Sequence, residues 1–145
     1  MEIRQLEPQV AAVKRVKTDA VDLPGVIDKG FPGLSGELSS KGVEVTGPPF
    51  VRYLQTGEQM EIELGIPIAA DSSPATKSIV LPPGPAGVYL YVGTYDGLPA
   101  AWDLFRQWLQ RQGYTQTGPF WESYVSDPRY TEPAERITEL YVPVE

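Results

Sequence analysis

The sequence predicts an α+β fold in which a strand-helix-strand-strand module occurs twice, forming an antiparallel sheet with helices on one side. Three observations predict it. Two sequence patterns recur in the same order about half a chain apart, each half contains short apolar segments typical of strands, and a helical segment follows in each half. We therefore expect a single domain over residues 1–145, with pseudo-repeats at about 1–70 and 77–145 related by a pseudo-twofold axis.

Two pairs of matching segments carry the repeat. Residues 47–53 read GPPFVRY and residues 118–124 read GPFWESY, so a Gly, a Pro, an aromatic residue and a final Tyr recur. Residues 63–68 read ELGIPI and residues 139–144 read ELYVPV, which share the pattern Glu-Leu-x-aliphatic-Pro-aliphatic. Because both matches occur in the same order, they indicate a duplicated structural unit.

In the first half, the apolar segment Val10 to Val16 is typical of a strand. The region 21–41 contains two prolines and four glycines, which disfavour a helix. We expect a broken helix there, best formed around Leu34 to Ser40. Two strands joined by a polar loop follow, and residues 70–76, rich in Ser, Ala and Pro, link the two halves.

The second half repeats this order with a clearer helix. A strand is expected from Ala86 to Val92. Pro99 suits the first turn of a helix, and Gly113 suits its end, where a left-handed residue closes the last turn. Apolar residues recur between them at spacings of three and four and form one broad face: Ala101, Trp102, Phe105, Trp108 and Leu109.

Alternation along each strand separates its two faces. The aliphatic sets are expected to be core packed against the helices: Ile62, Leu64, Ile66 and Ile68; Val88, Leu90 and Val92; Leu140, Val142 and Val144. The opposite faces then present Tyr89, Tyr91 and Tyr141. Such tyrosines either line the half-wet rim of a sheet or form the aromatic walls of a ligand pocket, and spacing leaves both interpretations open.

Glu122 is the candidate functional residue that stands out. It lies inside a strand pattern, where glutamate is disfavoured, and its expected face carries Phe120 and Tyr124, with Trp121 on the other face. A carboxylate among aromatic rings loses hydration, which raises its pKa unless a partner compensates. Glu122 is therefore either a solvated strand residue or a buried anion that selects cationic ligands or acts as a general acid or base.

The composition excludes several classes of function. The sequence has no Cys and no His, which excludes disulfides, thiolate chemistry, Ser-His-Asp catalysis and His-based zinc sites. The net charge of −7 repels phosphate backbones, and Glu58, Glu61 and Glu63 are expected on a solvated strand face. We expect no metal, no cofactor, no nucleic-acid partner, no membrane segment and no signal peptide, and hence a cytoplasmic protein.

Segments spread over nearly the whole chain resemble GyrI-like domains, also called bacterial transcription-activator effector-binding domains. The matching positions are residues 48–53, 62–68, 93–95, 98, 101–102, 105, 108–109, 113–114, 122–124, 127–128, 133 and 138–144. The resemblance implies a tandem of two strand-helix-strand-strand modules that bind hydrophobic, often cationic, compounds in a pocket between the modules. The residues that it places around the ligand are Glu122, as the family's main acid, with Tyr141, Glu139, Tyr53, Tyr89 and Trp102.

Three functions are compatible with this resemblance. The favoured one is a stand-alone protein that binds a small hydrophobic, aromatic or cationic ligand. The alternative is a GyrI-like hydrolase that acts on cyclopropane-bearing genotoxic natural products, with Glu122 as general acid or base. The third is a protein-interaction module such as a gyrase inhibitor, but no run of acidic residues supports a protein partner.

Overall fold

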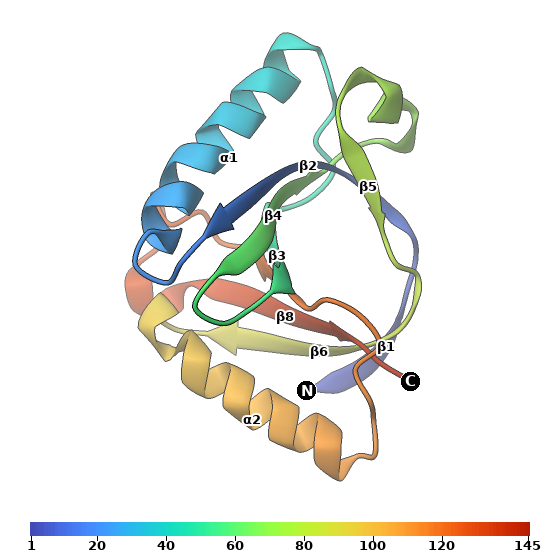
Figure 1. Cartoon of the computed structure of the whole chain (residues 1–145), viewed down its shortest axis with the longest axis vertical. Coiled ribbons are helices and arrows are strands. Elements are labelled where there is room, and N and C mark those ends of the chain that lie inside the picture. The colour runs from blue at the N-terminus through green and yellow to red at the C-terminus, as the bar shows by residue number, and fades with distance from the viewer. The chain divides into compact units, whose positions relative to one another are not determined.

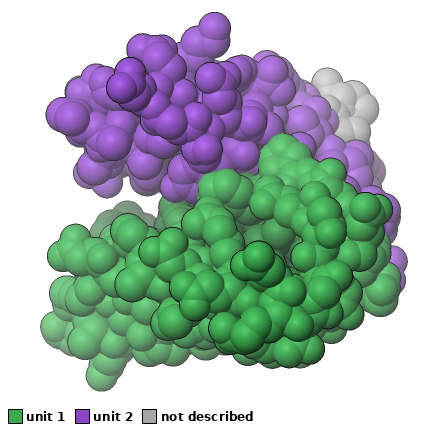
Figure 2. All heavy atoms as spheres, turned by 60° about the horizontal axis from the view of Figure 1, so that its bottom comes forward, with its two compact units in different colours: residues 1–6, 84–145 green, residues 7–83 purple. Residues whose placement is uncertain are grey.

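The computed structural model describes residues 1–145, except for the side chains of residues 73–75. It contains two compact units, coloured separately in Figure 2: unit 1, residues 1–6 and 84–145, and unit 2, residues 7–83. Each unit is an antiparallel sheet with an α-helix packed on one face (Figure 1). The predicted α+β class is confirmed.

Unit 2 contains the predicted strand-helix-strand-strand module. Its strands pair in the order β3-β4-β2-β5. The elements are β2 (Gln9–Thr18), α1 (Leu23–Ser40), β3 (Phe50–Gln55), β4 (Met60–Pro67), the 3₁₀ helix η1 (Ala70–Ala75) and β5 (Ser78–Leu81). Residues 70–76, expected to link the halves, lie inside this unit, and the side chains of residues 73–75 are outside the described part.

Unit 1 contains the second copy of the module. Its strands pair in the order β1-β6-β8-β7. The elements are β1 (Glu2–Leu6), β6 (Gly84–Val92), the 3₁₀ helix η2 (Tyr95–Gly97), α2 (Leu98–Arg111), β7 (Trp121–Tyr124), the 3₁₀ helix η3 (Pro133–Glu135) and β8 (Ile137–Pro143). As expected, α2 has Pro99 in its first turn, and Gly113 follows its end with φ of 82°.

The register of the strands confirms the repeat read from the sequence. In unit 2, Val51 of β3 lies opposite Leu64 of β4. In unit 1, Glu122 of β7 lies opposite Leu140 of β8. The duplicated sequence segments thus form equivalent strand pairs, and Glu122 occupies the position that an aliphatic residue fills in the other unit.

The outer strands of both sheets were not expected from the sequence. β1 precedes the first module in the chain but pairs with β6, the first strand of the second module. β5 precedes the second module but pairs with β2, the first strand of the first module. Each sheet is thus completed by a strand from outside its own repeat, and residues 1–6 belong with the second half of the chain.

The expectation of a broken first helix is wrong, because α1 is continuous from Leu23 to Ser40. Pro24 lies at its start, where no backbone donor is needed. Pro32 lies inside the helix and removes the N–H that would bond to the carbonyl of Asp28. Pro32 and Asp28 are both exposed, so water can reach that carbonyl, and burial of Leu34 and Leu38 against the sheet stabilises the helix.

At position 30 of α1, a glycine is needed although glycine is a poor helix former. A Cβ at this position would lie 2.1 Å from Cδ1 of Leu64, whereas one at Gly33 or Gly36 would meet nothing within 4 Å. Gly30 therefore lets the helix lie directly on the sheet. The helix-facing side of that sheet carries Ile62, Leu64, Ile66 and Ile68, all buried as predicted.

The predicted faces of β6 are reversed. Leu90 and Val92 are 52% and 55% exposed, whereas Tyr89 packs against Phe105 of α2 with ring centroids 5.8 Å apart. Gly87 lies on the same face, where a Cβ would be 2.7 Å from Leu109. The missing side chain lets α2 approach this face, so the helix covers the tyrosines. Val88 is buried as predicted, at 2% exposure, but it lies on the other face, opposite Tyr141.

Neither helix of the described residues combines the length and the apolar character needed to cross a bilayer.

Candidate ligand-binding site

Glu122 lies on the face of the unit 1 sheet that α2 covers. It belongs to the short strand β7 and pairs with Leu140, which is fully buried in the core beneath α2. Only 6% of Glu122 is exposed. Of the two alternatives that the sequence left open for Glu122, the structure therefore agrees with the buried carboxylate and not with the solvated strand residue.

Two neutral donors hold the carboxylate of Glu122. The indole Nε1 of Trp102 donates to Oε1 at 2.7 Å, and the hydroxyl of Tyr124 donates to Oε2 at 2.8 Å. Trp102 comes from α2, and Tyr124 is two residues further along β7, so it points to the same face. Hydrogen bonds from neutral groups stabilise an ionised carboxylate without cancelling its charge.

Aromatic rings continue outward from both donors. The ring of Phe120 meets that of Trp102 edge-on, with centroids 4.7 Å apart. The ring of Tyr95 meets that of Tyr124 edge-on at 5.9 Å. We call these four residues with Glu122 the Glu122 cluster: a carboxylate with an aromatic pair on each side.

Two arginines lie on the aromatic faces of the Glu122 cluster. The guanidinium of Arg106 is 5.1 Å from the ring centroid of Trp102 and 5.2 Å from that of Phe120. The guanidinium of Arg136 is 4.8 Å from the ring centroid of Tyr95. Both contacts are within the range of cation–π attraction, so the rings of this cluster already attract positive charge.

Burial affects the polar groups at the Tyr95 end of the cluster. Burial raises the pKa of Tyr95, the charge of Arg136 opposes this rise, and the negative charge of Glu122 adds to it. Nε of Arg136 and Oγ1 of Thr138 are buried without a hydrogen-bond partner among the described residues. Because Thr138 pairs with Tyr124 across the sheet, its hydroxyl lies on the face of Glu122.

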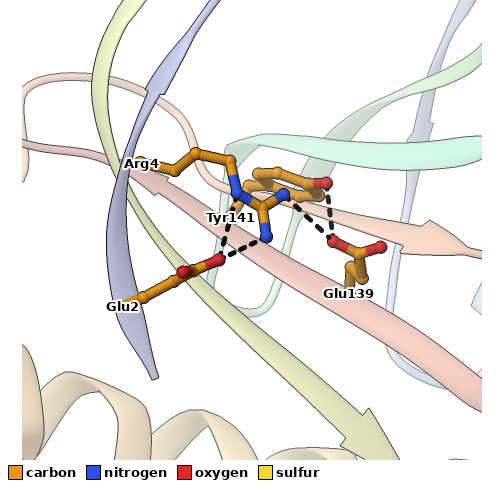
Figure 3. A network of polar contacts seen from close by, with 4 residues as sticks. All are labelled: Glu2, Arg4, Glu139 and Tyr141. Carbon is orange, nitrogen blue, oxygen red and sulfur yellow. Dashed lines mark hydrogen bonds and ion pairs between the residues drawn. The ribbon is translucent and has the colours of Figure 1, made fainter.

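The opposite face of the same sheet carries a separate network. The rings of Trp121 and Tyr141 stack with centroids 5.2 Å apart and planes 9° apart. The hydroxyl of Tyr141 donates to Oε2 of Glu139 at 2.8 Å, and Arg4 lies between Glu139 and Glu2 with ion pairs to both (Figure 3). Burial, and then the hydrogen bond to Glu139, raise the pKa of Tyr141 to about 12.

Within unit 1, the structure brings together some of the residues predicted for the site. Glu122 and Trp102 are in direct contact, and Tyr89 lies in the same cross-strand row, with Leu140 between it and Glu122. Tyr141 and Glu139 contact each other but lie on the other face of the sheet. Tyr53 belongs to β3 of unit 2, where it pairs with Ile62 on the helix-facing side.

Five residues of this region were not among the predicted site residues. Phe120 and Tyr124 were placed on the face of Glu122 by strand alternation, but neither was assigned to the site. No sequence signal connects Tyr95, Arg106 or Arg136 with Glu122, because their contacts arise only when α2, η2 and β8 fold onto β7.

The expectation that Glu63 is solvated is wrong, because it is only 2% exposed. It lies in β4 of unit 2, with Arg15 at 3.5 Å from Oε2 and Arg52 at 3.6 Å from Oε1. Glu61 is two residues away on the same face and also pairs with Arg15, at 3.6 Å. The strand pattern correctly put Glu61 and Glu63 on one face, whereas Glu58 lies in the loop between β3 and β4. The pattern could not show that two arginines pair with the buried carboxylate of Glu63.

No group of three or more acidic side chains in the described part of the chain is arranged to hold a metal ion. The chemistry available at the Glu122 cluster is that of a carboxylate, an indole N–H and phenol hydroxyls. This set can attract a cation, contact flat apolar groups, or move a proton at the carboxylate.

Comparison with known proteins adds the following. A family model described as "GyrI-like small molecule binding domain" matches residues 1–145. A search of curated proteins found no match. Among solved structures, the EcmrR C-terminal domain superposes with a TM-score of 0.83 at 23% identity, covering 99% of this chain and 96% of that one. EcmrR in a complex with DNA superposes with a TM-score of 0.85 at 24% identity; there the match covers 99% of this chain but only 56% of EcmrR.

Two further structures share the fold at lower identity. SAV2435, bound to tetraphenylphosphonium, superposes with a TM-score of 0.68 at 14% identity; the match covers 99% of this chain and 93% of the SAV2435 chain. A hydrolase from Listeria innocua superposes with a TM-score of 0.64 at 17% identity; the match covers 99% of this chain and 91% of the hydrolase chain. At these identities the likeness concerns the fold alone.

Proposed function

This chain belongs to the GyrI-like family of small-molecule binding domains, and from this premise we propose that it captures hydrophobic, aromatic or cationic compounds at the Glu122 cluster. The observation that carries the proposal is a carboxylate with 6% exposure, held by an indole N–H and a phenol O–H. The sequence-based expectation that the pocket lies between the two modules stays a prediction.

The charge of Glu122 supplies selectivity in this proposal. Moving an ionised carboxylate out of water is costly, and neutral donors offset the cost only in part. A cationic ligand brought near the carboxylate replaces the lost hydration with a charge–charge attraction, which is stronger in a low-dielectric environment than in water. A neutral ligand of the same shape gains no such attraction.

The aromatic rings supply most of the affinity. Rigid rings provide large apolar contact areas at low entropic cost, and their faces attract cations. Arg106 and Arg136 already use the faces of Trp102 and Tyr95 in this way. The ligand class that fits is therefore an aryl-bearing cation, and tetraphenylphosphonium, the compound bound to SAV2435, is a suitable probe. The net charge of −7 disfavours nucleic acid as a direct partner.

Titration calorimetry with tetraphenylphosphonium and with neutral triphenylphosphine oxide tests this function. Wild-type protein should bind the cation more tightly than the neutral compound. Glu122→Gln should weaken the cation about tenfold and change the neutral compound little. An equal loss for both compounds, or no binding of the cation to the wild type, contradicts the proposal.

A second candidate is hydrolysis, favoured by the hydrogen-bonded carboxylate and by the fold shared with a hydrolase from Listeria innocua. Glu122 would take a proton from a water molecule while the oxygen of that water attacks an electrophilic carbon, such as one of a strained cyclopropane. The proton would then pass to the group that leaves with the bonding electrons. Multiple turnovers that add one water to such a substrate, lost in Glu122→Gln, support this candidate, whereas stoichiometric binding without product excludes it.

A further inference from the structure

A cation of the chain itself, the guanidinium of Arg106, lies over the rings of Trp102 and Phe120. Arg106 lies one helical turn after Trp102 on α2, and its guanidinium is within 5.2 Å of both ring centroids. Trp102 is only 5% exposed, although Arg106 itself is half exposed. The same indole that donates to Glu122 is therefore covered by a side chain that can move into solvent.

Arg106 is held only weakly by its ion pair. Its ion pair with Asp103 is 4.0 Å long, and both side chains are largely exposed, so water and salt screen the attraction. The ring contacts are then the more specific part of its environment. A long, exposed side chain held in this way exchanges between conformers easily.

We propose that Arg106 is a specificity-determining residue that competes with cationic ligands for the aromatic face of Trp102 and Phe120. This inference rests on the proposed function. A ligand cation that displaces the guanidinium exchanges one cation–π contact for another, so it gains little from the ring pair. Only compounds with large apolar groups, which add contact area beyond the exchanged charge, bind well in the presence of Arg106. Small cations gain too little.

Arg136 repeats the arrangement at the other end of the Glu122 cluster. Its guanidinium lies 4.8 Å from the ring centroid of Tyr95, and its Nε is buried without a hydrogen-bond partner among the described residues. An arginine at each end of the cluster shows that its ring faces accept planar cations. Arg106 is the better test, because the exposed Arg111 on the same helix offers a matched control.

The test compares Arg106→Gln with Arg111→Gln by titration with tetraphenylphosphonium, with the small cation phenyltrimethylammonium and with neutral triphenylphosphine oxide. Both variants lose one positive charge from α2, so any long-range effect on cation binding is shared. Arg106→Gln should strengthen binding of both cations by about threefold to tenfold, with the neutral compound unchanged, because the guanidinium no longer competes for the two rings. Arg111→Gln should leave all three affinities near those of the wild type.

The possible results separate the two ideas. If the wild type binds tetraphenylphosphonium and Arg106→Gln binds it no more tightly, Arg106 does not compete with the ligand. The same follows if Arg111→Gln gains as much affinity as Arg106→Gln. In both cases the proposed function stands. If none of the three proteins binds either cation, the proposed function fails as well. Weaker cation binding by Arg106→Gln would show that Arg106 helps to build the site, which also overturns the inference.

Discussion

Glu122 and Tyr141 lie on neighbouring strands of one sheet but on opposite faces of it. Glu122 pairs with Leu140 beneath α2, and Tyr141 pairs with Trp121, on which its ring stacks. The two groups that the family resemblance placed around one ligand are therefore separated by the thickness of the sheet. The proposed function assigns the ligand to the Glu122 face, and the Tyr141 face holds its own network with Glu139 and Arg4.

Tyr141 should titrate with a pKa of about 12, because burial and the hydrogen bond to Glu139 disfavour its ionised form. Glu139→Gln should lower this pKa, whereas Glu122→Gln, on the other face, should leave it unchanged. The pKa is measured by an NMR titration of the ring resonances, assigned by comparison with Tyr141→Phe. Equal shifts in both variants would contradict the separation of the two faces.

The same raised pKa predicts how stability depends on pH. In the unfolded chain Tyr141 ionises near the ordinary value of 10, and in the folded chain near 12. Its contribution to stability is thus fully present below pH 10, because both states are protonated there. Between pH 10 and 12 the unfolded state loses its proton first, so stability falls as pH rises. Urea unfolding over this range should show a smaller fall in Glu139→Gln.

Tyr124→Phe should lower the free energy of unfolding by about 1–2 kcal/mol, because it removes a donor from a buried carboxylate. Tyr130→Phe is the matched control, since Tyr130 is 82% exposed and its loss of a hydroxyl should change little. Urea unfolding measures both values. Equal effects would show that the Tyr124 hydroxyl does not stabilise Glu122.

Gly30→Ala should destabilise unit 2, whereas Gly36→Ala should stabilise it by about 0.5–1 kcal/mol. Both changes add the same methyl group to α1. At Gly30 the methyl would meet Cδ1 of Leu64 at 2.1 Å, and at Gly36 it meets open space. Thermal unfolding measures the two effects, and the close contact of helix and sheet is contradicted if both variants gain stability.

Glu63→Gln should cost about 2–3 kcal/mol, because it leaves Arg52 with a neutral partner in a buried setting. Glu61→Gln is the control: it loses a similar ion pair to Arg15, but its side chain is partly exposed. Its effect should be within about 0.5 kcal/mol. The free energy of unfolding is measured in urea. If both variants lose the same amount, the burial of Glu63 does not add to the stabilising effect of its ion pairs.

The sequence predicted most of the architecture because local patterns determine it. The aliphatic alternation of β4 and the spacing of apolar residues along α2 each identify a face that must be buried. Gly87 shows where this reasoning fails. In β6 both faces carry apolar or aromatic residues, and the absence of a side chain at Gly87, rather than hydrophobicity, decided which face α2 covers. The position of a glycine relative to a packing helix is a tertiary property.

The site was predictable only along one strand. Period-two alternation correctly placed Glu122 with Tyr124 and apart from Trp121. It could not show that Trp102 donates to Glu122 or that Arg106 and Arg136 lie over the rings, since these contacts join residues from different elements. The prediction that Glu63 is solvated was wrong for the same reason, because its burial depends on arginines from β2 and β3.

The exchange of outer strands means that neither repeat is self-sufficient. A fragment ending before β5 would leave one edge of β2 unpaired and would carry β1 without its partner strand. A fragment beginning at β5 would leave one edge of β6 unpaired. Open edges of this kind recruit strands from other chains. A gene encoding a single repeat with its leading strand would therefore be expected to yield a homodimer, in which each copy donates that strand to its partner and both sheets are completed by domain swapping.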